Sequence, residues 1–244
     1  MSFTAGEREI LLPIVSALVV GAYHLWLALK VRSNPRYTIQ SLLNAARIAW
    51  VARMMSGNEG ILAVQTLRNA IMGATFFAST AIALIVGTIT LSVQGDRLTQ
   101  IWSSGASLAA ITGAASTAAS MAISGAIDSP IEQHLWLIKI LLLLIDMMCA
   151  FIFFAHAIRL NAHVGVLIGV PKSEMDPGVV AHLFIRAGRF HTRGMRCYYL
   201  AGPLMFWLFG PAAMLAASIA LVVVLYFLDR SPLLRKPIVR YVSI

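Results

Sequence analysis

The feature that most constrains this chain is a set of long apolar runs that carry no charged side chains. The clearest one extends from Ala70 to Leu91, about 22 residues without a charge. At 1.5 Å per residue, a helix of this length crosses a hydrocarbon core of about 30 Å. Arg68 and Asn69 lie at its start, where water would give way to lipid. The run predicts an all-α membrane protein with several transmembrane helices.

Four runs qualify as spans and predict a single membrane domain over residues 1–244, at about 10–29, 70–91, 135–158 and 200–228. Charged residues make up only 12% of the chain, against about 25% in soluble domains, so much of the surface should face lipid. Pro203 and Pro211 interrupt the fourth run. We expect a single kinked or tilted crossing there, with a re-entrant hairpin bent at both prolines as the alternative.

The charged residues between the spans predict how the chain is oriented. The link between the first two spans holds six basic residues against one acid, and the link between the third and fourth holds six against two. The positive-inside rule places both links in the cytoplasm and the N-terminus outside. The membrane is expected to be a bacterial inner membrane. A basic tail after the fourth span fits a four-span topology poorly, because that topology puts the tail outside.

The links themselves should be partly helical. Apolar residues recur at three- and four-residue steps over 37–56, and a similar pattern begins within 178–198, so both segments predict amphipathic helices on the cytoplasmic side. Residues 101–127 are uncharged and rich in small side chains. We interpret them as a helix at the outer face, because a fifth span there would move a strongly basic link outside.

Composition and motifs argue against several function classes. The net charge of +9 is best explained by topogenic Lys and Arg that contact anionic lipid, and nothing predicts binding to nucleic acid. Cys149 and Cys197 have neither a disulfide nor a zinc spacing, and no histidine pair has metal-ligand spacing. No nucleophile arrangement or phosphate-binding glycine loop is present, so the sequence predicts no catalytic residues and no enzyme.

Several motifs lie close to the predicted membrane boundaries. They comprise Arg47, Trp50 and Met54, then Ile61–Asn69 and Ala74–Ser79, then Arg159, Asn161 and His163, and finally Arg189, Phe190, Gly194, Arg196, Tyr199, Trp207 and Phe209–Pro211. The pattern resembles a DUF599-like family of four-span integral membrane proteins from bacteria and plants, over roughly residues 40–215. The resemblance implies the fold and topology and attaches no activity. Asp146 and His156 do not belong to the family pattern.

Asp146 is the costliest residue in the predicted membrane region, because a carboxylate near the centre of a span costs at least about 2.5–3.5 kcal/mol to insert. It lies near the middle of the third span, and Lys139 shares its helical face about 10 Å away along the axis. The two residues are candidates for an ion or proton pathway. The alternative is an aspartate that is protonated or hydrogen-bonded and holds helices together.

Two further groups of residues suggest ligands. His24 and His156 lie at similar predicted depths in the first and third spans, which would allow a b-type haem between them, although no cofactor is required by the sequence. A girdle of polar side chains should gather at the cytoplasmic surface and contact an anionic ligand or lipid. Its candidate members are Arg68, Asn69, Arg159, His163, Arg189 and Arg196. Topogenic charge and helix capping explain the same residues without a ligand.

Close-packing residues outnumber chemically reactive ones, and this excess decides the predicted function. We expect a non-enzymatic structural or accessory subunit, as a homo-oligomer or within a larger membrane complex, packed through Gly73, Ala74, Gly202 and Gly210. The first alternative is a small transporter or channel that uses Asp146 and the arginine girdle. The second is a haem redox protein that uses His24 and His156.

Overall fold

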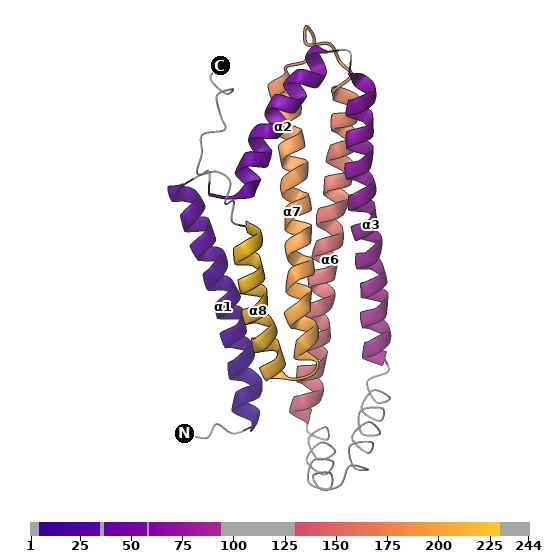
Figure 1. Ribbon diagram of the computed structural model, residues 1–244. Helices are drawn as coiled ribbons and strands as arrows, with labels where there is room; N and C mark the ends of the chain where they lie inside the picture. Colours follow the sequence, from indigo (N-terminus) through magenta and orange to yellow (C-terminus); the bar gives the residue numbers. More distant parts are fainter. Residues whose placement is uncertain (1–4, 35–36, 58, 94–129, 230–244) are drawn as a thin grey trace, which may run out of the picture.

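A computed structural model describes residues 5–34, 37–57, 59–93 and 130–229 of the 244. Within these ranges the chain forms six helices and no strand (Figure 1). They are α1 (Ala5–Ser33), α2 (Ile39–Ser56), α3 (Gly60–Val93), α6 (Pro130–Leu167), α7 (Pro177–Trp207) and α8 (Pro211–Asp229). The predicted outer helix over 101–127 lies outside the described residues.

Four of these helices are long and apolar enough to cross a membrane. The candidate segments are Glu9–Ser33, Gly60–Thr90, His134–Leu167 and Pro211–Asp229. Together they indicate an integral membrane protein. The predicted all-α fold with four such helices is therefore confirmed.

Two of the spanning helices are much longer than a bilayer is thick. α3 has 34 residues and α6 has 38, which correspond to about 51 Å and 57 Å of helix. A hydrocarbon core needs only about 30 Å. The additional turns, at 60–69 and 159–167, hold the charged and polar side chains that precede or follow the apolar runs. The helices therefore continue past the membrane boundary that hydropathy predicts.

The additional turns belong to a helical extension that carries its own apolar core. We call "the extension" the part of the bundle formed by α2, the start of α3, the end of α6 and the start of α7, at the upper end of Figure 1. Its core consists of Val51, Met54, Ala63, Leu67, Val164, Ile168, Val180 and Ala181. Asp176 begins α7 by accepting a hydrogen bond from the backbone N–H of Gly178 at 3.0 Å.

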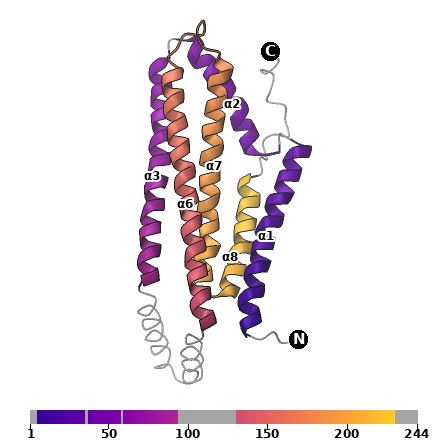
Figure 2. The ribbon, with the colours of Figure 1, turned by 180° about the vertical axis from the view of Figure 1, so that it is seen from behind.

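A second core lies in the half of the bundle away from α2. Small side chains of α3, such as Ala74 and Ala78, meet Met147 and Phe154 of α6, with Cys197 and Ala201 of α7 completing the cluster. α1 and α8 form a separate pair, packed through Tyr23, Leu27 and Leu225, and α8 joins this pair to α7. Figures 1 and 2 show α8 beside the lower part of α7, with α1 on the outer side of α8.

The single kinked or tilted crossing expected over 200–228 is not what the structure has, because the chain reverses direction there, which is closer to the alternative of a hairpin. α7 ends at Trp207 and α8 begins at Pro211, running back alongside α7 (Figure 1). Gly210, with φ of 136°, adopts a backbone conformation that L side chains avoid, and Pro211 has no N–H with which to continue α7. Pro203 lies inside α7 without ending it, so the reversal occurs over 208–210 alone.

Candidate functional site

The bundle contains three groups of ionisable residues, which we call levels. At the first level, Nζ of Lys139 on α6 lies 3.4 Å from Oε2 of Glu9 on α1. The same ammonium lies 5.6 Å from the ring centroid of Trp207 on α7. Only 12% of the Lys139 side chain is exposed, so its charge is held by the carboxylate and the aromatic face.

Asp146 forms the second level, two helical turns from Lys139 and about 10 Å along α6. Its Oδ2 atom is buried and has no hydrogen-bond partner among the described residues. The thiol of Cys197, on α7, lies within hydrogen-bonding reach of the carboxyl group. The described ion pairs include no basic side chain at Asp146, which distinguishes it from the acids of the other two levels.

The third level joins three helices at one carboxylate. Oδ2 of Asp229, at the end of α8, accepts a hydrogen bond from the hydroxyl of Tyr23 on α1 at 3.0 Å. It also lies 3.6 Å from Nη2 of Arg196 on α7. Arg196, predicted as part of an anion-binding girdle, thus already has a carboxylate partner. Because Arg196 directly precedes Cys197 in α7, this level adjoins the Asp146 level.

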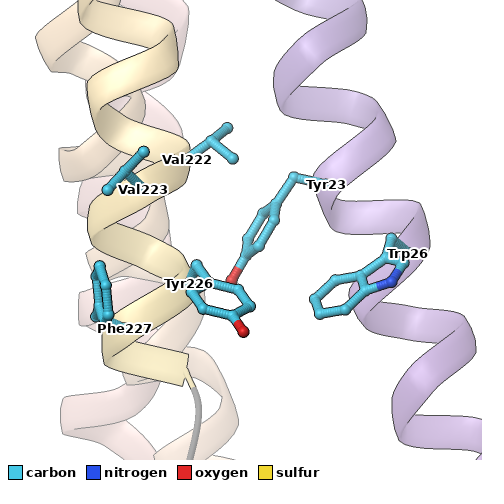
Figure 3. A pocket seen from close by; sticks show the side chains of 6 residues that line it. All are labelled: Tyr23, Trp26, Val222, Val223, Tyr226 and Phe227. Carbon is cyan, nitrogen blue, oxygen red and sulfur yellow. The ribbon is translucent and has the colours of Figure 1, made fainter.

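An apolar groove lies beside the third level. It encloses about 440 Å³ between α1 and α8, and its lining residues are Tyr23, Trp26, Val222, Val223, Tyr226 and Phe227. Figure 3 shows the rings of Tyr23 and Trp26 reaching from α1 toward Tyr226. Such a lining suits a hydrocarbon chain and offers no reactive group. Tyr23 belongs to both features, since its ring lines the groove while its hydroxyl reaches Asp229.

A second polar cluster, which hydropathy and spacing did not single out as a site, lies where α2 packs on α7. The guanidinium of Arg47 donates to Oδ1 of Asn44 at 3.0 Å and lies 5.5 Å from the ring centroid of Phe184. Burial lowers the pKa of Arg47, and no acid is paired with it in the described parts of the chain. About two turns after Phe184 on α7, burial and the nearby Arg47 lower the pKa of His191.

The other predicted girdle residues lie on the surface of the bundle. Arg68, Asn69, Arg159, His163 and Arg189 are all exposed, and they are distributed over α3, α6 and α7. A shared anionic ligand at these five residues stays a prediction. Their exposure also suits the simpler role of marking the polar side of the membrane boundary.

The two predicted haem ligands lie on helices whose main packing partners differ. His24 is on α1, which packs on α8, and His156 is on α6, which packs on α3 and α7 (Figures 1 and 2). Each ring directs its Nδ1 atom to a backbone carbonyl of its own helix at 2.9 Å, and His156 also stacks on Phe190. A haem held between the two histidines stays a prediction.

Two of the four residues predicted to mediate subunit contacts are used within the subunit. Ala74 is fully buried in the core formed by α3, α6 and α7, and Gly210 makes the turn between α7 and α8. Gly73 remains exposed on α3, and Gly202 is partly buried. Among the described residues, no three of the His, Cys, Asp and Glu side chains are grouped so that they could hold a metal ion.

Comparison with known families places this arrangement in context. Residues 10–232 match the family described as protein of unknown function, DUF599, which covers most of the chain. The chain belongs to the DUF599 family. The predicted resemblance to DUF599 is confirmed, and the match runs from near the start of α1 past the end of α8. No curated protein and no solved structure matches the chain.

Proposed function

We propose that the chain is a membrane transport protein that conducts protons through the bundle, past Asp146 at the interface of α6 and α7. The observation that supports this proposal is the succession of ionisable groups through the bundle, from Glu9 and Lys139 through Asp146 to Arg196 and Asp229. Ionisable residues inside membranes are expensive, and they mark ion pathways and proton relays.

Asp146 is the central element of this proposal. Lys139 and Arg196 each have a carboxylate partner, so pairing offsets the cost of placing these charges among apolar helices. Asp146 has no such partner in the described region, and one of its oxygens makes no hydrogen bond. An acid inside a membrane that has no ion-pair partner is a candidate for a proton relay.

The arrangement favours a proton over a larger cation. Calcium takes six to eight oxygen ligands and magnesium also needs a full octahedral shell, whereas a proton needs a single carboxyl oxygen. Asp146 supplies that oxygen, and the described residues around it show no group of three ligands. A thiol, such as that of Cys197, is a weak hydrogen-bonding group that leaves the carboxyl free to exchange its proton.

We further propose that the extension faces the cytoplasm of a bacterial inner membrane. Because α7 and α8 are antiparallel, the lower part of α7 would act as a fifth crossing, with α8 returning to the side of α2. The basic residues that follow α8 in the sequence, Arg230, Arg235, Lys236 and Arg240, then lie on the same side as the two basic links. This topology satisfies the positive-inside rule where a four-span topology does not.

Proton flux into liposomes tests the function. Protein reconstituted with a pH-sensitive dye inside the vesicles, and driven by a potassium diffusion potential, should acidify the lumen faster than empty vesicles do. Asp146→Asn should reduce this rate at least tenfold, because an amide cannot carry the proton. Asp176→Asn is the matched control, since asparagine also caps helices and the residue lies outside the bundle interior. Equal rates for wild type and Asp146→Asn, or no flux above empty vesicles, would overturn the proposal.

A further inference from the structure

The contact between α2 and α7 places a cation where the protein supplies no balancing charge. Nη1 of Arg47 donates to Asn44, while Nη2 and Nε make no described hydrogen bond to protein. No carboxylate lies within ion-pairing distance among the described residues. By contrast, Arg53 of the same helix is exposed and pairs with Glu59 at 3.0 Å. A partly buried guanidinium without an acid retains donors for an anion.

Gly188 allows the guanidinium to lie against α7. A Cβ atom at this position would come within 2.5 Å of Cζ and 2.6 Å of both terminal nitrogens of Arg47. Phe184, one turn earlier, supports the cation through its ring face. Arg47 is therefore held in place by a glycine and an aromatic ring, which position the charge without neutralising it.

Further donors follow on the same side of the α2–α7 contact. Gln40 lies two turns before Arg47 on α2, and its Nε2 atom is buried without a hydrogen-bond partner. Its Oε1 atom accepts a bond of 3.3 Å from the hydroxyl of Thr192 on α7. His191, adjacent to Thr192, lies close enough to Arg47 for the two to interact electrostatically. Guanidinium, amide and imidazole N–H groups are all donors that suit phosphate oxygens.

We propose that Arg47, assisted by Gln40 and His191, binds a phosphate group between α2 and α7. The phosphate belongs either to a lipid headgroup or to a free anion, and both present the same oxygens. The position of the site suits a headgroup, because α1 ends at Ser33, only a few residues before Gln40, and so the site lies near the membrane surface. This binding site is independent of the proposed proton pathway.

Binding is tested on the full-length protein purified in a neutral detergent. The probes are phosphatidylglycerol in mixed micelles, diacylglycerol with the same chains, and inorganic phosphate, read out by thermal stability and by native mass spectrometry. We expect phosphatidylglycerol to raise the unfolding temperature and to remain bound in the mass spectrum, and diacylglycerol to do neither. Stabilisation by inorganic phosphate as well would assign the site to free phosphate. A response to neither phosphate source would overturn the proposal.

Variants locate the binding to these residues. Arg47→Gln should weaken the apparent affinity at least tenfold, while Arg53→Gln, with the same charge change on the same helix, should bind as wild type does. Gly188→Ala keeps every charge but displaces the guanidinium of Arg47, so it should also weaken binding. It provides the test if the Arg47→Gln variant does not fold. Undiminished binding by a folded Arg47→Gln or by Gly188→Ala would refute the assignment.

Discussion

Gly194 provides a direct test of how α6 and α7 are packed. A Cβ atom at this position would come within 2.8 Å of Cε2 and Cζ of Phe154. The Phe154 ring is fully buried, stacks on Phe77 at a centroid distance of 5.3 Å, and has the rings of His191 and Tyr198 against it. The ring has little freedom to withdraw. Gly194→Ala should therefore force a shift in the interface of α6 and α7.

The expected size of the effect follows from known costs of overpacking. An extra methyl group in a well-packed core costs roughly 1–3 kcal/mol. Replacing glycine by alanine inside a helix stabilises the folded protein by up to about 1 kcal/mol, because alanine has the higher helix propensity. Gly87→Ala on α3 should show only the gain in helix propensity, because a Cβ atom at position 87 has no neighbour within 4 Å. The difference between the two variants isolates the packing cost, and it should amount to roughly 1–3 kcal/mol.

The assay is reversible unfolding in mixed micelles with increasing sodium dodecyl sulfate, followed by tryptophan fluorescence. Phe154→Leu should lower stability alone, yet it should restore part of the loss caused by Gly194→Ala, since it removes the colliding ring atoms. A double-mutant cycle gives this coupling directly. If Gly194→Ala unfolds at the same detergent concentration as Gly87→Ala, Phe154 does not lie against α7 as described.

The same titration checks three further expectations. Gly210→Ala should cost roughly 1–3 kcal/mol, because its φ of 136° strains any residue with a Cβ; no loss would place the turn elsewhere. Tyr23→Phe should cost roughly 1–3 kcal/mol by removing the hydroxyl that donates to Asp229, and an unchanged midpoint would contradict that bond. The lowered pKa of His191 means that the unfolded chain binds its proton more readily. Stability should thus fall as the pH drops below about 6.5, and less so in His191→Gln; equal slopes would argue against a buried neutral imidazole.

Much of the fold could be predicted because insertion into lipid depends on composition. Runs such as 70–91 identify helices whatever their neighbours are, and four such helices are present. Helix ends were harder to predict. Arg68 and Asn69 mark where the apolar run begins, but both residues can lie inside a helix and so do not mark its start. α3 therefore begins at Gly60, well before its apolar run. The reversal before Pro211 was predicted only as the alternative, a hairpin bent at Pro203 and Pro211, because hydropathy averages over a turn of three residues.

The candidate site was predictable only in part, because tertiary contacts determine which side chains form ion pairs. Asp146 was identified by the cost of burying it and Lys139 because it shares the same helical face, but the pairing of Lys139 with Glu9 depends on how α1 meets α6. Arg47 and Arg53 look equivalent in the sequence, both lying off an apolar stripe. The structure separates them, because α7 covers only Arg47. The signal for this difference is Gly188, more than a hundred residues away in the sequence.

The short turn at 208–210 decides whether the chain would cross the membrane an even or an odd number of times. With α7 running one way and α8 the other, α1 starts at one face of the bundle and Asp229 lies toward the opposite face (Figure 1). In the five-crossing topology proposed above, the two ends of the described chain face different compartments. A reporter fused before α1 and one fused after α8 would then sense different surroundings in the same cell.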